Sequence, residues 1–117
     1  MDDGRPLFLQ LAVQIENQII DGTLAEGAQV PSINEFAVFH RINPATALKG
    51  IALLVDSGVL FKRRGIGMFV ADGARDQLLT TRRQRFDAEF IHPLLAEARA
   101  LGLTTDQLIE MIRKDTP

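Results

Sequence analysis

The chain of 117 residues contains no cysteine, no tryptophan and no tyrosine. Without cysteine, disulfide bonds, thiol nucleophiles and cysteine-ligated metal sites are excluded. Seven phenylalanines are the only aromatic residues, so the chain has few side chains of the kind on which single-stranded bases stack. Single-stranded nucleic acid is therefore a poor candidate ligand.

Histidine is also scarce, and the patterns of known catalytic sites are missing. The two histidines, His40 and His92, are far apart and have no metal-ligand spacing to a carboxylate cluster. No Ser-His-Asp order or nucleophile elbow occurs, and Gly65-Ile66-Gly67 lacks the further glycine and the helix of a dinucleotide-binding loop. The paired acids Asp2 and Asp3 stand at the terminus. We therefore predict no catalytic residue, no metal site and no cofactor, and expect that the protein is not an enzyme.

Long apolar runs are the third absence. No stretch is long enough to span a bilayer, and no signal peptide is present. We therefore expect a cytoplasmic protein with no membrane partner. With 46% hydrophobic residues, a chain of this length can bury one modest core.

The pattern that organises the chain lies between residues 31 and 70. Ser32 and Glu35 form a capping box that predicts a short helix ending near His40, where a cation suits the helix dipole. Asn43 followed by Pro44 predicts the start of a second helix, and Gly58 predicts its end. Helical spacing assigns inward positions to Ile33, Phe36, Ala37, Ala47, Ile51, Leu54 and Val55.

A basic hairpin is predicted directly after this helix pair. Residues 59–61 favour a strand, Lys62-Arg63-Arg64 is a cationic run, residues 65–67 favour a turn, and residues 68–70 return. Residues 28–30 favour a short third strand. Two capped helices followed by a basic hairpin predict a winged helix-turn-helix, a fold that reads DNA with the N-terminal residues of its second helix.

Four segments in this order resemble the DNA-binding domain of the GntR family of bacterial transcriptional regulators, and most closely its short YtrA-like branch. They are residues 6–11, Pro31-Ser32, residues 43–46 and residues 63–70. The resemblance implies a sequence-specific regulator of double-stranded DNA, a repressor acting as a homodimer on a near-palindromic operator. Two positions depart from the family, because Asn34 and Leu48 stand where the family usually has a basic residue. The departures therefore imply that the chain binds DNA more weakly than the family usually does, or that it binds an altered operator sequence.

The predicted DNA-binding residues fall into three groups. The N-terminal part of the second helix is expected to meet base edges or nearby backbone. The capped end of the first helix, together with one lysine, is expected to meet phosphate or the groove, and the wing is expected to anchor the complex. The residues of the second helix are Asn43, Ala45 and Thr46. The phosphate or groove group is Ser32, Asn34 and Lys49, and the wing group is Arg63, Arg64 and Gly65. Residues 1–72 carry six basic and eight acidic side chains, but five of the six cations lie between Arg41 and Arg64. We therefore expect modest, salt-sensitive affinity.

The remaining segments are predicted to be helical. An amphipathic helix spans about residues 5–21, and residues 71–74 form a hinge. Beyond the hinge, a helix from about Arg75 to Leu101 should kink or break before Pro93, and a last helix starts at Thr104 with a capping box to Gln107. The predicted fold class is therefore mainly α with a small β-wing, with a DNA-binding domain at residues 1–72 and a two-helix tail at residues 73–117.

The tail is too short to enclose a core of its own, so its apolar stripe needs a partner. A second copy of the chain is the predicted partner, because a two-fold dimer presents two reading helices to successive turns of DNA. The predicted dimerisation residues are Leu79, Phe86, Phe90, Leu94, Leu101, Leu108 and Ile112. A small-molecule effector stays possible but unidentified.

An alternative function is left open by the two missing cations. A winged helix with weakened or lost DNA binding can serve as a protein-interaction module, with Leu48, Leu53 and Val55 as an outward apolar patch. The three cations of the wing favour the DNA-binding regulator over this alternative.

Overall fold

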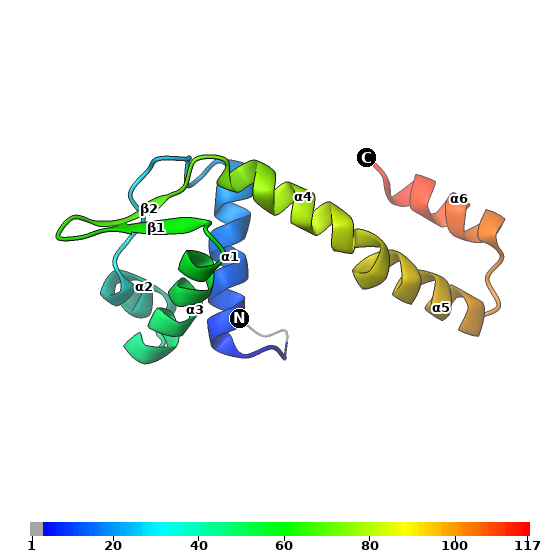
Figure 1. The fold of residues 1–117 in the computed structure, drawn as a ribbon. Coiled ribbons are helices and arrows are strands. Elements are labelled where there is room, and N and C mark those ends of the chain that lie inside the picture. Colours follow the sequence, from blue (N-terminus) through cyan, green and yellow to red (C-terminus); the bar gives the residue numbers. More distant parts are fainter. Residues whose placement is uncertain (1–3) are drawn as a thin grey trace. The chain divides into compact units, whose positions relative to one another are not determined.

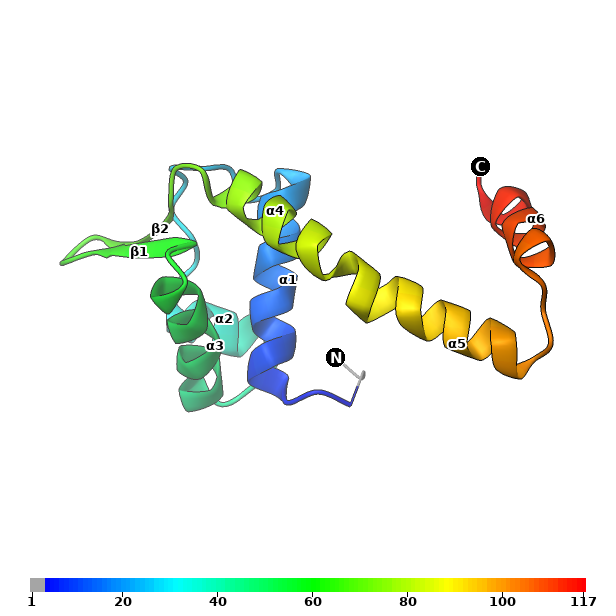
Figure 2. The ribbon, with the colours of Figure 1, turned by 45° about the vertical axis from the view of Figure 1, so that its right-hand side comes forward.

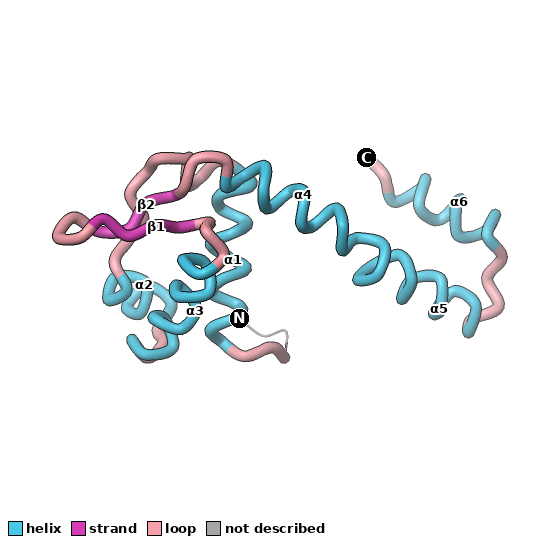
Figure 3. The backbone as a smooth tube through the Cα atoms, viewed as in Figure 1, coloured by secondary structure: helices cyan, strands magenta, loops and turns pink. Residues whose placement is uncertain are grey.

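The computed structural model describes residues 4–117, so Asp2 and Asp3 lie outside the described residues. It contains helices and one two-stranded antiparallel sheet (Figures 1 and 3), which confirms the predicted mainly α class with a small β-wing. The elements are α1 (Leu7–Asp21), α2 (Ile33–His40), α3 (Pro44–Asp56), β1 (Leu60–Arg63), β2 (Gly67–Val70), α4 (Ala74–Phe86), the π-helical turn η1 (Asp87–Ile91), α5 (His92–Ala100) and α6 (Thr105–Asp115). The chain divides into two compact units, one ending at Thr80 and one starting at Thr81.

Helix α1 is the scaffold of the first unit. It begins at Leu7 because Pro6 has an extended ψ of 144° and occupies the N-cap, and it ends at Gly22, whose φ of 88° is a left-handed conformation that suits glycine. Its buried face carries Leu11, Ala12, Ile15 and Ile19. The helix therefore starts two residues later than the sequence predicts and ends where predicted.

Helices α2 and α3 have the caps that the sequence predicts. The Ser32 hydroxyl accepts from the Glu35 N–H at 3.1 Å, and the Glu35 carboxylate accepts from the Ser32 N–H at 3.0 Å. The Asn43 side chain accepts from the Ala45 N–H at 2.7 Å, and Pro44 occupies the first turn of α3. Both predicted helix starts are confirmed.

Helix α3 packs closely against α1, and the two lie side by side in both views (Figures 1 and 2). Gly50 makes this approach possible, because a Cβ atom there would lie 2.7 Å from the Phe8 carbonyl oxygen. The inward positions of α2 and α3 are confirmed for Phe36, Ala37, Ala47, Ile51 and Leu54, which are buried with Val59, Leu60 and Val70 of the wing base. The prediction for Val55 is wrong, since this side chain is exposed.

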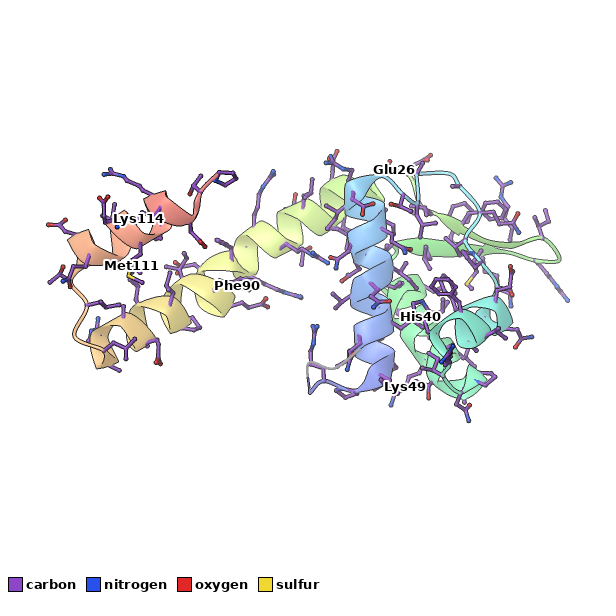
Figure 4. All side chains as sticks on the ribbon, turned by 180° about the vertical axis from the view of Figure 1, so that it is seen from behind. Glu26, His40, Lys49, Phe90, Met111 and Lys114 are labelled. Carbon is purple, nitrogen blue, oxygen red and sulfur yellow. The ribbon has the colours of Figure 1, made fainter. Side chains whose placement is uncertain are left out.

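The start of α4 corrects the predicted hinge. Ala74 and Leu78 are buried in the core of the first unit. The Glu26 carboxylate accepts from the Gly73 N–H at 2.6 Å and the Arg75 N–H at 3.4 Å, and so caps α4 (Figure 4). Arg75 Nε donates to the Ile20 carbonyl at 2.8 Å. Hydrogen bonds therefore fix the start of α4 on the first compact unit, which extends to Thr80. The domain boundary at residue 72 stays a prediction.

The second unit contains the end of α4, then η1, α5 and α6. Pro93 cannot donate to residue 89, and just before it the His92 N–H donates to the Asp87 carbonyl five residues back, which gives the wider π turn. The predicted interruption is therefore confirmed as a π-helical turn. The capping box of Thr104 and Gln107 is also confirmed. Within residues 81–117, only Ala98 and Leu108 are buried apolar side chains.

Two further observations limit the kinds of site that the described residues can form. None of the helices within residues 4–117 has the length and apolar character needed to cross a membrane. Across the same residues, His, Asp and Glu nowhere gather in a group of three that could hold a metal ion.

Candidate nucleic-acid interface

The N-terminal end of α3 presents the residues predicted to read bases. Asn43 and Ala45 are exposed, and Thr46 is half-buried. Asn43 uses its Oδ1 atom to cap the helix through Ala45, which leaves its amide N–H groups as donors for an external acceptor. The three predicted residues therefore share one exposed end of the helix.

The N-terminal end of α2 places Ser32 and Asn34 at the surface. The Ser32 hydroxyl oxygen accepts from the Glu35 N–H, and its O–H faces the Glu35 carboxylate, which would compete with a phosphate oxygen for this donor. Glu35 adds a negative charge beside it, because hydrogen bonds from the backbone and then the side chain of Ser32 lower the pKa of its carboxyl. Asn34 adds no cation at this end of α2, although Lys62 of the wing lines the same pocket as Ser32 and Glu35.

Lys49 is held by a contact with α1 (Figure 4). Its Nζ atom lies 4.2 Å from the centre of the Phe8 ring, within the range of a cation–π interaction. The neighbouring Leu48 is 52% exposed and presents an apolar surface where the family usually has a cation. The exposed Val55 extends this apolar surface two turns along α3, whereas Leu53 is exposed on another face of the helix.

The wing carries its cations on two faces. In the antiparallel pairing, Phe61 lies opposite Phe69 and Arg63 opposite Gly67. Alternation therefore puts Phe61 and Arg63 on one face of β1 and Lys62 on the other. The Arg63 guanidinium carbon lies over both rings, 5.8 Å from the centre of Phe61 and 5.2 Å from that of Phe69. Arg64 and Gly65, the other predicted wing residues, are exposed at the turn.

Gln29 fixes the turn of the wing from outside the hairpin. It forms an isolated antiparallel bridge with Phe69, and backbone hydrogen bonds join Ala28 to Val70 and Val30 to Met68 on either side. The predicted third strand is therefore present as this short bridge to β2. Its side-chain amide donates to the Ile66 carbonyl at 3.0 Å. A Cβ atom at Gly67 would lie 2.6 Å from that amide nitrogen, and the φ of Gly67 is 140°, so glycine is needed at this position.

Four residues of this surface are absent from the sequence prediction: Phe8, Gln29, Phe61 and Phe69. Phe61 has a local signal, since alternation in a strand predicts that Phe61 and Arg63 share a face. Pairing across the hairpin then brings Phe69 opposite Phe61. The contacts of Phe8 and Gln29 join residues 41 and 37 positions apart, and no local pattern indicates them.

The predicted dimerisation residues differ in exposure. Phe86, Phe90, Leu94, Leu101 and Ile112 are exposed, and the Phe86 and Phe90 rings lie 5.7 Å apart. Leu79 is half-buried, and Leu108 is buried within the second unit because α6 turns it inward. Met111, which the prediction omits, is 53% exposed on α6 (Figure 4).

A capped helix pair followed by a basic hairpin defines the winged helix-turn-helix class, whose function is to bind DNA. Residues 7–70 match the family described as bacterial regulatory proteins, gntR family. This match covers more than half of the chain, and the protein belongs to that family. It is a transcriptional regulator with a DNA-binding helix-turn-helix, which confirms both the resemblance and the prediction that it is not an enzyme.

Two relatives from Bacillus subtilis (strain 168) are similar over nearly the whole chain. The uncharacterized HTH-type transcriptional regulator YhcF is 28% identical over 113 residues, which cover 97% of this chain and 92% of YhcF. The HTH-type transcriptional repressor YtrA is 25% identical over 109 residues, which cover 93% of this chain and 83% of YtrA. The similarity therefore includes the helical tail as well as the DNA-binding part.

Two solved structures are informative in different ways. A GntR family transcriptional regulator from Listeria monocytogenes superposes with a TM-score of 0.82 at 24% identity, covering 99% of this chain and 100% of that one, and supports the fold. The AraR DNA-binding domain, solved in complex with operator ORX1, superposes with a TM-score of 0.55 at 30% identity, covering 57% of this chain and 81% of that one.

Proposed function

We propose that the protein is a homodimeric repressor that binds a near-palindromic DNA operator. The observation that carries this proposal is that one compact unit exposes both the N-terminal end of α3 and a cationic wing. A helix of this kind enters the major groove with its first residues, and phosphate contacts fix its register. The AraR domain, whose structure includes an operator, and YtrA, a repressor by name, support the proposal.

The proposed roles follow the chemistry of each group. Asn43 and Thr46 would donate or accept at base edges, and the Ala45 methyl would meet an apolar base surface. Ser32, Asn34 and Lys49 would contact phosphates, and the guanidinium groups of the wing would bind phosphates through paired N–H donors. The wing turn would approach DNA closely because Gly65 carries no side chain. The DNA-binding domain would comprise the residues up to 72, with the first turns of α4 packed on it.

Dimerisation is proposed for the tail because its apolar side chains lack a core. Within residues 81–117, Phe90 is 63% exposed and Leu101 is 66% exposed. A two-fold dimer through this surface would bury these side chains and present two reading helices about 34 Å apart, one turn of DNA. No effector is assigned, although a ligand that changed the dimer would change the spacing of the helices.

The first experiment measures binding of the full chain to duplex DNA from its own upstream region and to a shuffled duplex across a salt series. We expect a preference for the native duplex and a linear fall of log affinity with log salt that implies several phosphate contacts. Arg64→Ala should weaken binding to both duplexes and lower the slope by about one unit. Thr46→Ala should instead reduce discrimination between them.

Failure of the full chain to bind either duplex at low salt would reject the proposal and favour a protein-interaction module that uses the apolar surface of Leu48 and Val55. The dimer has a separate test by sedimentation across concentrations. Phe90→Ser should weaken self-association about tenfold or more if Phe90 is central to the interface, whereas the adjacent exposed substitution Glu89→Ser should have little effect. A monomer at all concentrations would reject the dimer.

A further inference from the structure

The wing contains a cation with a defined position. The Arg63 guanidinium lies over the Phe61 and Phe69 rings, and these rings stack with centres 5.7 Å apart at an interplanar angle of 26°. Arg63 faces Gly67 across the hairpin, and the Gln29 amide occupies the place that a Cβ atom of Gly67 would take. Arg64, the next residue, has no ring contact among the described residues, although it carries the same charge.

The position of this cation matters because arginine is flexible. A free arginine side chain gives up about 2 kcal/mol of rotamer entropy when it is fixed against a ligand. A guanidinium held over a ring face has already given up part of that freedom, while its N–H donors at the edge of the plane stay available for a phosphate. Cation–π contacts at exposed sites are strong enough to bias the rotamer but do not lock it.

The same arrangement occurs at the reading helix. Lys49 Nζ lies 4.2 Å from the centre of the Phe8 ring, and Phe8 belongs to α1. Arg63 and Lys49, two of the cations that are proposed to contact DNA, therefore each lie over a phenylalanine ring. Gln29 adds to this order in the wing, because its hydrogen bond to the Ile66 carbonyl fixes the turn that follows Arg63 and Arg64.

We infer that Phe61 and Phe69 are positioning residues for DNA binding: they hold the Arg63 guanidinium in the conformation in which it meets the DNA backbone. This inference rests on the proposed function, since it requires the wing to contact DNA. Phe61 and Phe69 touch no DNA atom in this role and act through Arg63. The ring pair thus contributes to affinity for duplex DNA of any sequence.

The test is a double-mutant cycle on DNA affinity, measured by fluorescence anisotropy at one salt concentration. Phe69→Leu should weaken binding about two- to fivefold in the wild-type background, the range of an exposed cation–π contact. In an Arg63→Ala background the same substitution should change affinity by less than about 1.5-fold, because the group that Phe69 positions is gone. In the matched Arg64→Ala background, its full effect should persist.

Two further variants separate positioning from folding. Phe69→Tyr keeps a ring and should retain affinity, and Phe61→Leu, at a more exposed position, should reproduce the coupling with Arg63. Equal losses from Phe69→Leu in the wild-type and Arg63→Ala backgrounds would overturn the inference and make Phe69 a structural residue of the wing. An Arg63→Ala protein that binds like wild type would also overturn it and leave the proposed function standing. Absence of DNA binding by the wild-type chain would instead reject both.

Discussion

The two compact units of the chain bury apolar side chains to very different extents. Of the seventeen buried apolar residues among the described residues, fifteen belong to the core of the first unit, and Ala98 and Leu108 belong to the second. The second unit nevertheless exposes large apolar side chains along its helices: Phe86, Phe90, Leu94, Leu95, Leu101, Ile109, Met111 and Ile112. The helices of the first unit are therefore stabilised by a buried core, whereas those of the second unit have almost no core.

This difference explains why the two units are suited to different tasks. The first unit can hold a reading helix in a fixed place, because burial of α3 against α1 defines its position. The second has caps and helical spacing but almost no core, so local interactions define its helices and a partner must cover their apolar faces. Stability that depends on a partner also depends on protein concentration.

The sharpest test of this comparison is a pair of isoleucine truncations. Ile51 is 1% exposed in the first unit and Ile112 is 51% exposed in the second. Ile51→Ala should lower the free energy of unfolding by about 2–5 kcal/mol, because it leaves a cavity in a packed core. Ile112→Ala should cost below about 1 kcal/mol in the monomer. Urea unfolding at a concentration that disfavours the dimer measures both, and equal costs would contradict the comparison.

A smaller effect is expected at the contact between α1 and α3. Gly50→Ala places a methyl group 2.7 Å from the Phe8 carbonyl oxygen, a backbone atom that cannot rotate away. The resulting shift of the helices should cost about 1–3 kcal/mol and outweigh the gain of about 1 kcal/mol in helix propensity. Ala52→Gly, on the outer side of the same helix, removes a methyl group without a clash and serves as the control for propensity. An unchanged or raised melting temperature for Gly50→Ala would show that α1 and α3 are not tightly apposed.

The junction at the start of α4 gives the next prediction. Glu26→Gln should weaken the cap that holds the Gly73 and Arg75 N–H groups, at a cost of about 0.5–2 kcal/mol. Hydrogen exchange should accelerate at residues 73–78 before it accelerates in α3. Glu110→Gln, at an exposed position of α6, is a charge-matched control for the loss of a carboxylate. If Glu26→Gln left exchange at residues 73–78 unchanged, the junction would behave as the hinge that the sequence predicts.

The features that could be predicted from the sequence are those whose partners are close in the chain. Each capping box joins residues three positions apart, as in Ser32 with Glu35 and Thr104 with Gln107. The wing is indicated by strand formers on both sides of a glycine turn. Pro93 likewise interrupts its own helix, and only the form of the interruption, a π turn, required the structure.

The features that could not be predicted depend on contacts between distant residues. Glu26 caps α4 by accepting from the N–H of Gly73, 47 residues later in the chain. The sequence around residues 71–74 looks like a hinge because this partner is not nearby. The ring that contacts Lys49 has the same origin, because Phe8 stands far from Lys49 in the sequence and a phenylalanine pattern alone predicts core packing. The candidate DNA-binding residues could be named from spacing, whereas the contact that positions Lys49 could not.

The smallest effect concerns the pH dependence of the first unit. Burial lowers the pKa of His40, whose ring lies 5.0 Å from Phe39 and 6.2 Å from Phe36. The folded chain therefore binds this proton less tightly than the unfolded chain, so stability is greatest above pH about 6.5 and falls as the pH drops through that value. The sequence predicts that a positively charged His40 suits this helix end, whereas burial favours the neutral side chain. His40→Gln should abolish this part of the pH dependence of the urea midpoint between pH 8 and 5.5, and His92→Gln, at an exposed histidine of the second unit, should not. If wild type and His40→Gln lost stability equally over this range, burial would not control the titration of His40, and the first unit would owe its acid sensitivity to other groups.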